Sequence, residues 1–429
     1  MLRSRPGSAA AGSLLSGLFS QGILAISGIL LARYLGPENR GYLALFVLIP
    51  LAISQLGELG LPTAAAYHIA KNPCAARTIV RVLRGPFLAQ CLLLSAVQAL
   101  VMVAVFSRAA PTVYLAALAS VPQVSSVILL DYGLAILQGQ QRFLSFNVLR
   151  TVPGVFNAFA AVAVWRGKAD LVATTILLML AALLAGAITV AVALGGLRRL
   201  GAREPAPTRT SMLRFGTRSL IGSLYPIETF RLEQLLIGWL LSPATLGIYV
   251  AAVAFTNLPR FVAQSLGLVA YPRIAAQRSL IRRRQLTWRY FLFSTALCSL
   301  TVATLELVIG PLVPALFGER FAAAVPVARL LLVGTLFLSA RRILAESLKG
   351  AGYPGAGTVA EMVSLALLLI VMLPLTDSFG LLGVAASVSV AGAGSLAVVL
   401  WFHATKPALS AQRLAIVSES GTRGKERHR

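Results

Sequence analysis

Four charged side chains lie within one long apolar stretch of the sequence, residues 215–241. They are Arg218, Glu228, Arg231 and Glu233. About 20 helical residues at ~1.5 Å each cross the ~30 Å hydrocarbon core of a bilayer, so the stretch is long enough to span a membrane. An ionised side chain at mid-membrane costs about 2.5–3.5 kcal/mol. A helix that carries several of them should therefore face protein or water rather than lipid.

The spacing of these charges leaves two interpretations open. Glu228 and Arg231 are three residues apart, so on one helix they share a face and can neutralise each other, whereas Glu233 points to a different face. The pair can be a purely architectural buried ion pair. It can also belong to a polar, solvent-reachable site on a transport path, which is the interpretation we favour.

Other charged residues also fall in apolar stretches. Arg260 lies in the second half of the chain, and Glu58 and Asp131 lie in the first half. Carboxylates at membrane depth suit sugar hydroxyls, a proton relay or a sodium site. Glu58 and Asp131 could face Arg231 or Arg260 across a cavity.

Composition defines the class of protein. The chain has 429 residues, of which 57% are hydrophobic and only 12% are charged. A soluble domain does not need so much apolar surface, so we predict an all-α polytopic membrane protein. The three cysteines are too few for a disulfide framework and have no metal-site spacing.

Hydrophobic runs separated by charged residues or by Gly and Pro predict about twelve transmembrane helices. The N-terminus has the basic start of a signal peptide, but the apolar run continues to Leu31, so we expect an uncleaved first span. The predicted spans are 12–32, 41–61, 86–106, 112–133, 147–165, 171–194, 215–241, 246–270, 287–310, 324–348, 357–376 and 380–402.

The basic residues predict the orientation of these spans. The chain has 38 Lys and Arg against 14 Asp and Glu, a formal net charge of +24. In a soluble protein this excess would suggest a nucleic-acid partner. Here most basic residues fall in the N-terminus, in every second loop and in the C-terminal tail. By the positive-inside rule we predict that both termini are cytoplasmic. We expect the protein in the cytoplasmic membrane, and we expect no nucleic-acid partner.

The two halves of the chain repeat the same order of motifs. Pro37 and Gly41, for example, correspond to Pro243 and Gly247. Each half has an even number of spans, so the halves form parallel repeats. We predict a six-helix bundle at 1–194, a cytoplasmic linker at 195–214, a second six-helix bundle at 215–403 and a basic, disordered cytoplasmic tail at 404–429. A short basic amphipathic helix is predicted at 72–85.

Several motifs resemble the polysaccharide (oligosaccharide) flippase family of the multidrug/oligosaccharidyl-lipid/polysaccharide (MOP) exporter superfamily. They are LLARYLGPENRGYLAL (30–45), LQGQQRFLSFNVLR (137–150), LLIGWLLSPATLGIYVAAVAFTNLPRF (235–261), YPRIA (271–275), ALFGERFAAAVPVARLL (315–331) and LKGAGYP (348–354). The resemblance implies two six-helix bundles around a central cavity. It also implies transport of an undecaprenyl-diphosphate-linked glycan to the outer leaflet by alternating access.

This resemblance gives the charged residues their expected roles. Arginine binds phosphate oxygens in a bidentate manner and stays charged at low dielectric, so Arg231, Arg218 and Arg260 would contact the diphosphate. Coupling to H⁺ or Na⁺, or contact with sugars, is expected from Glu228, Glu233, Glu58 and Asp131. No cofactor or metal is expected. The expected partners are the lipid-linked glycan, membrane lipids, and a polysaccharide polymerase or glycosyltransferases.

Two alternatives compete with a flippase. A cation-coupled exporter of drugs or other small molecules in the same superfamily also has about twelve spans. A membrane-embedded glycan polymerase or ligase is the alternative from another class. The sequence has no Walker loop, metal cluster or nucleophile with its base, so we do not expect an enzyme. The lipid II flippase of the superfamily usually has two additional C-terminal spans, which argues against a peptidoglycan precursor as substrate.

Overall fold

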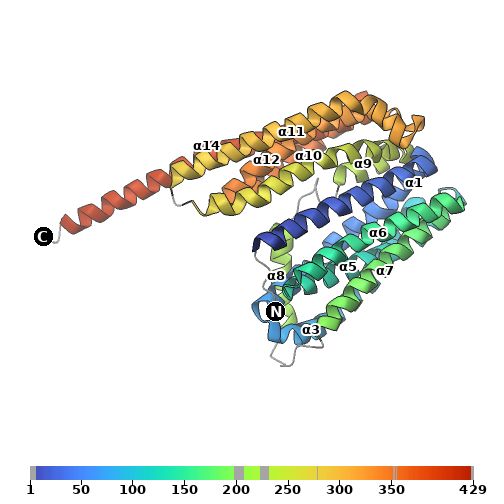
Figure 1. Ribbon diagram of the computed structural model, residues 1–429, viewed down its shortest axis with the longest axis horizontal. Coiled ribbons are helices and arrows are strands. Elements are labelled where there is room, and N and C mark those ends of the chain that lie inside the picture. Colours follow the sequence, from blue (N-terminus) through green and yellow to red (C-terminus); the bar gives the residue numbers. More distant parts are fainter. Residues whose placement is uncertain are drawn as a thin grey trace. The chain divides into compact units, whose positions relative to one another are not determined.

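In the computed structural model, the chain folds into α-helices joined by short turns. The structure describes residues 6–197, 207–222, 231–277, 279–350, 353 and 355–426. These ranges contain no strand, which agrees with the predicted all-α fold class. The helices in Figure 1 are α1 (Pro6–Gly57), α2 (Leu61–Lys71), α3 (Ala76–Phe106), α4 (Pro111–Ala119), α5 (Pro122–Gly139), α6 (Phe143–Gly167), α7 (Leu171–Leu197), α8 (Arg209–Gly222), α9 (Leu232–Leu240), α10 (Pro243–Ala275), α11 (Leu280–Phe317), α12 (Ala324–Gly350), α13 (Gly355–Phe379) and α14 (Leu381–Glu426).

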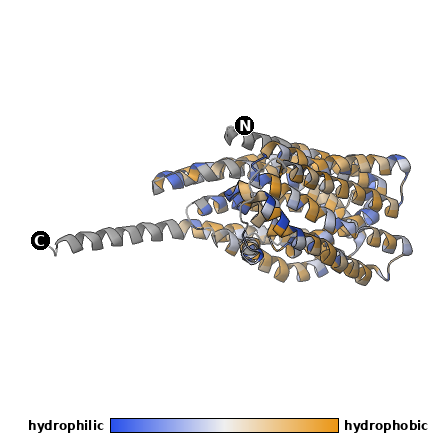
Figure 2. Cartoon of the chain, turned by 90° about the horizontal axis from the view of Figure 1, so that it is seen from below, coloured by the Kyte–Doolittle hydropathy of each residue, from blue (hydrophilic) through white to orange (hydrophobic). Residues whose placement is uncertain are grey.

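The protein is a multi-pass membrane protein. Within the described ranges, ten helical segments are long and apolar enough to cross a bilayer, and Figure 2 shows the hydrophobic residues along them. The sequence predicted about twelve spans, and α1 accounts for part of the difference. Its two predicted spans, 12–32 and 41–61, follow one another in one long helix with a break at Gly36, where φ is 75° and ψ is 175°.

The predicted seventh span, 215–241, accounts for the rest of the difference. α8 ends at Gly222, residues 223–230 lie outside the described part of the chain, and α9 begins at Leu232. Arg231 directly before α9 has φ 48° and ψ 48°, in the left-handed region. This conformation is incompatible with a right-handed helix. The prediction that Arg231 lies within one continuous helix is therefore wrong, and Glu228 falls among the residues that are not described.

Two segments predicted to lie beside the spans are instead continuous with them. Residues 72–85 do not form a separate amphipathic helix, because after a 3₁₀ turn at Pro73–Ala75 they enter α3, which continues through Pro86 to Phe106. α14 likewise continues beyond the last predicted span and ends at Glu426. The prediction that the tail 404–429 is disordered stays a prediction.

The chain divides into two compact units. One comprises Met1–Ala251 and Val313–Ala322, and the other comprises Ala252–Leu312 and Ala323–Arg429. This division places α8 and α9 in the first unit. The predicted bundle boundaries around the linker 195–214 stay a prediction.

Each unit has its own packing core. In the first unit, Ile69 of α2, Ile79 of α3 and Ile128 of α5 are fully buried in one cluster, and a second cluster joins α1, α6 and α7. The second unit contains a cluster of α12, α13 and α14. It also contains a buried ion pair between Arg341 and Glu361. In a membrane such close packing, rather than apolar burial alone, holds helices together.

Two glycines that the sequence repeat makes equivalent pack reciprocally within the first unit. Gly41 of α1 lies against the carbonyl group of Pro243, and Gly247 of α10 lies against the carbonyl group of Pro37. A Cβ atom at either glycine would overlap a backbone oxygen. A reciprocal contact between equivalent segments is what a two-fold axis produces. The two segments that correspond in the sequence repeat thus contact each other in the structure.

Candidate functional site

A cavity of about 630 Å³ in the first unit contains the clearest concentration of polar groups. Its wall carries two carboxylates, Glu58 and Asp131, and two amides, Gln55 and Gln138. No Lys or Arg belongs to the wall as far as the structure describes it. The cavity therefore combines negative charge with hydrogen-bonding groups in otherwise apolar surroundings.

Glu58 lies at the break between α1 and α2. The next two residues, Leu59 and Gly60, both have left-handed backbones, with φ of 53° and 65°. The left-handed region costs a residue such as Leu59 about 1–2 kcal/mol, so the surrounding contacts must hold the break in place. The Glu58 side chain is only 7% exposed, and its Oε1 atom is buried without a hydrogen-bond partner among the described residues. A buried polar atom without a partner costs about 1–3 kcal/mol, so a proton, a water molecule or an ion at this position would stabilise the fold.

Asp131 reaches the same cavity from α5. It shares one face of that helix with Leu134 and Gln138, at spacings of three and seven residues. Asp131 lies close enough to Glu58 for their charges to interact unfavourably. Two carboxylates beside one cavity without a basic neighbour can share a proton or bind a cation.

The kind of cation is limited by the available ligands. The described part of the chain has no group of three or more His, Cys, Asp and Glu side chains that could hold a metal ion. Zinc and other transition metals usually require such a set. Glu58 and Asp131 can instead take up a proton or bind a cation that also uses the neighbouring amide oxygens.

A chain of hydrogen bonds holds the helix break behind Glu58. Gln90 of α3 donates from Nε2 to the carbonyl oxygens of Gly57 and Glu58, at 3.1 and 3.0 Å. The hydroxyl of Tyr132 in turn donates to Gln90 Oε1 at 2.6 Å. These bonds satisfy carbonyl groups at the end of α1 that no longer have helical partners. The sequence analysis missed Gln90 and Tyr132 because neither is charged, although a glutamine inside an apolar span was an available signal.

α8 packs directly on the same break. Phe215 stacks on Tyr67 of α2 with ring centroids 4.4 Å apart, and both rings line the cavity. A Cβ atom at Gly60 would overlap the carbonyl group of Gly216. α8, whose residues 215–222 begin the charged 215–241 stretch, is thus in contact with Tyr67 and Gly60 beside Glu58.

The arginines predicted to bind phosphate lie elsewhere. Arg218 is exposed on α8 and Arg231 is half-buried before α9, and neither is in the cavity wall. Arg260 is half-buried on α10, in the second unit. Within the first unit the structure thus brings Glu58 and Asp131 together but does not add Arg231 to them. The roles of the three arginines stay predictions.

The predicted acids of the seventh span have different outcomes. Glu233 is buried on α9, only 5% exposed, and Gln234 donates from Nε2 to Glu233 Oε1 at 3.4 Å. Glu228 lies outside the described residues. The roles of Glu233 and Glu228 in coupling or in contact with sugars therefore also stay predictions.

Comparison with known proteins assigns the family. Residues 10–277 match the sequence model of a family described as "Polysaccharide biosynthesis protein". The chain belongs to the polysaccharide biosynthesis protein family. A search of curated proteins found no match for this polysaccharide biosynthesis protein.

Solved structures of transporters share its fold. One is a multidrug resistance MATE family transporter of the MOP superfamily in an inward-facing conformation, with 16% identity, a TM-score of 0.73, and coverage of 91% of this chain and 96% of that one. Another is the lipid II flippase MurJ in an inward closed conformation, with 12% identity, a TM-score of 0.68, and coverage of 91% and 87%. A MOP superfamily transporter from Pyrococcus furiosus matches with 15% identity, a TM-score of 0.61, and coverage of 95% and 97%. This polysaccharide biosynthesis protein therefore has the MOP transporter fold.

Proposed function

We propose that this protein is a flippase that moves an undecaprenyl-diphosphate-linked oligosaccharide from the cytoplasmic to the outer leaflet by alternating access. The observation that carries the proposal is the polysaccharide biosynthesis family match in a chain with the MOP transporter fold. The fold is also that of a lipid II flippase. A diphosphate and its sugars cannot cross hydrocarbon unaided, so such a carrier must supply a polar path while the prenyl tail stays in lipid.

In this proposal the acidic residues and the arginines have different roles. Glu58 and Asp131 take up a coupling H⁺ or Na⁺ in their cavity, because they are two acids without a basic neighbour in the described wall. Arg231, Arg218 and Arg260 contact the diphosphate, with Glu228 and Glu233 as further coupling or sugar-binding groups. No chemical bond is made or broken, so the protein acts as a carrier and not as an enzyme.

A cation-coupled exporter of small molecules is the second candidate. The observation that favours it is the cavity itself, whose wall combines two carboxylates with the stacked rings of Tyr67 and Phe215. Acids and aromatic faces together suit an organic cation. The MATE transporter with the same fold is described as a multidrug resistance protein. A glycan polymerase or ligase is the third alternative, and the described residues offer no observation in its favour.

Cells without this protein are expected to lose their surface polysaccharide and to accumulate the lipid-linked oligosaccharide in the inner leaflet. The physical reason is that the glycan has no other polar path across the bilayer. The lipid extract and the surface polysaccharide are measured together, with the intact gene on a plasmid as the control. Normal polysaccharide combined with increased sensitivity to cationic drugs would favour the exporter instead. Accumulation of single repeat units already on the outer side would favour a polymerase.

The proposed orientation, with both termini cytoplasmic, predicts a labelling pattern. Asp377 at the end of α13 and Thr208 before α8 are both exposed, so each can carry a single cysteine after Cys74, Cys91 and Cys298 are replaced. Asp377→Cys should react with an impermeant thiol reagent added to intact cells. Thr208→Cys should react only after the cells are permeabilised, and the reverse pattern would invert the topology.

A further inference from the structure

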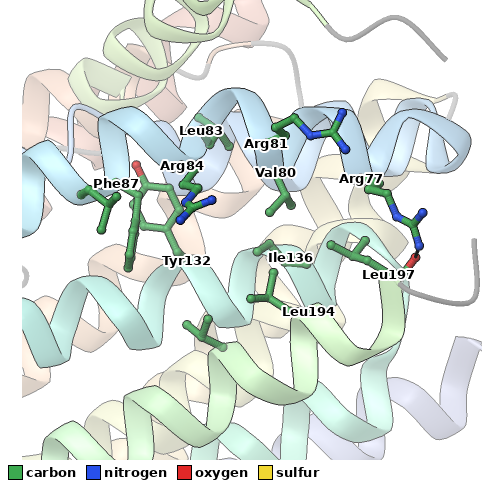
Figure 3. A pocket seen from close by; sticks show the side chains of 12 residues that line it. Arg77, Val80, Arg81, Leu83, Arg84, Phe87, Tyr132, Ile136, Leu194 and Leu197 are labelled. Carbon is green, nitrogen blue, oxygen red and sulfur yellow. Dashed lines mark hydrogen bonds between the residues drawn. The ribbon is translucent and has the colours of Figure 1, made fainter. Parts of the chain in front are cut away.

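A second cavity, in the first unit, has no part in the proposed transport path. It has a volume of about 450 Å³ and lies where α3, α5 and α7 meet. Figure 3 shows Arg77, Arg81 and Arg84 following one another along α3, across the opening from Leu194 and Leu197 of α7. The floor is formed by Tyr132 and Ile136 of α5. These two residues lie on a different face of α5 from Asp131 and Gln138, so α5 separates the two cavities.

The charges of this cavity are of one sign. Arg77 donates to the carbonyl oxygen of Leu197 at 3.3 Å and so helps to close the end of α7. Arg81 and Arg84 are exposed, and neither forms an ion pair with any residue that the structure describes. No Asp or Glu belongs to the described wall. The rim therefore offers guanidinium groups, which bind phosphate oxygens strongly.

The apolar part of the cavity continues along the same face of α3. Arg77, Arg81, Arg84 and Leu88 follow the helical spacing of three and four residues. Leu88 is 47% exposed, and Leu92 one turn further on is 73% exposed. The lining of the cavity also includes Val190 and Leu194 of α7. The site thus changes from cationic to apolar along α3, within about 10 Å at 1.5 Å per residue.

We propose that this cavity binds an anionic phospholipid, with its phosphate at Arg81 and Arg84 and part of an acyl chain along Leu88, Val190 and Leu194. The one-sided charge selects an anion, and the exposed apolar wall selects one that carries a hydrocarbon chain. Basic pockets between membrane helices bind anionic head groups in this way. A free phosphate would use the arginines but leave the apolar wall uncovered.

A lipid bound in this second cavity would also stabilise the cavity that contains Glu58 and Asp131. Tyr132, in the floor of the second cavity, donates a hydrogen bond to Gln90, which in turn donates to the carbonyl groups of Gly57 and Glu58. A lipid packed on Tyr132 fixes the first member of this chain. Binding of the lipid should therefore raise the thermal midpoint of the folded protein.

The experiment uses the purified full chain in a neutral detergent, titrated with phosphatidylglycerol or phosphatidylcholine. We expect phosphatidylglycerol to bind at least about tenfold more tightly and to raise the thermal midpoint. The double variant Arg81→Gln/Arg84→Gln should lose this preference. The matched control Arg108→Gln/Arg166→Gln, which removes two exposed arginines of the same unit outside the cavity, should keep it.

A second pair of variants tests the acyl-chain wall without touching a charge. Leu194→Trp fills the cavity and should weaken phosphatidylglycerol binding, whereas Leu180→Trp, at an exposed position of the same helix, should not. An unchanged preference in Arg81→Gln/Arg84→Gln would overturn the proposal. Inorganic phosphate that stabilises the protein as strongly as the lipid, with no effect of Leu194→Trp, would also overturn it, because the site would then bind a soluble anion.

Discussion

Replacing Glu58 by Gln together with Asp131 by Asn is expected to reduce coupled transport by about ten- to a hundredfold at unchanged protein abundance. The estimate follows from charge-assisted interactions of about 1.5–3 kcal/mol, which correspond to factors of this size. Both side chains line one cavity, and the described wall of this cavity contains no Lys or Arg. The Oε1 atom of Glu58 has no hydrogen-bond partner among the described residues. Their neutral amides keep the shape of the wall but cannot take up a cation. Folding should be preserved, because removing two close like charges relieves repulsion.

The measurement is substrate movement in proteoliposomes with and without an imposed H⁺ or Na⁺ gradient. The native protein should respond to one of the two gradients, and the double variant to neither. Glu306→Gln is a suitable control, because Glu306 forms a partly exposed ion pair with Arg329 at 3.7 Å, and such pairs contribute little. Gradient-driven transport at the native rate in the double variant would show that these acids are not the coupling site.

The fold was largely predictable because each span is a long apolar run with polar ends. α6 and α7, for instance, occupy Phe143–Gly167 and Leu171–Leu197, close to the predicted 147–165 and 171–194. Breaks in helices were less predictable. The left-handed backbone at Arg231 could not be predicted from the hydropathy of the sequence. Hydropathy reports the length of an apolar segment and not its backbone conformation. The same limit explains why α2 was not predicted after the break at Glu58.

The acid cavity was only partly predictable. Glu58 and Asp131 could be selected because ionisable residues are rare at membrane depth. Their proximity could not be predicted, because it depends on how α5 packs against the break after α1. Gln90 and Tyr132 carry no charge, and only the hydrogen bonds between them show their role. The arginines were selected by the same rule as the acids, yet Arg218 is exposed, because depth in a span does not determine which face of a helix is covered.

Alanine at Gly41 or Gly247 is expected to disrupt the reciprocal contact between α1 and α10. Each added Cβ would overlap a carbonyl oxygen, of Pro243 or of Pro37, and backbone atoms cannot move aside as a flexible side chain can. Overpacking of this kind costs about 1–3 kcal/mol. The cost applies only to the conformation in which the two segments touch, so it should shift the conformational equilibrium away from that state by about 5- to 150-fold. Turnover should fall, because the proposed alternating access requires both states.

Two readouts separate this effect from a general loss of stability. Gly22→Ala on α1 is the matched control, since a Cβ there meets nothing within 4 Å; it should leave turnover unchanged. Ser242, directly before α10, is half-buried, and a single cysteine there should react faster with an impermeant thiol reagent once Gly247→Ala has separated the segments. Both variants could instead behave like Gly22→Ala, with unchanged turnover and unchanged reactivity of Ser242→Cys. In that case the contact between α1 and α10 would not take part in the transport cycle. A slower cycle with faster labelling would instead identify the 37–41 and 243–247 segments as a contact that must open and close during transport.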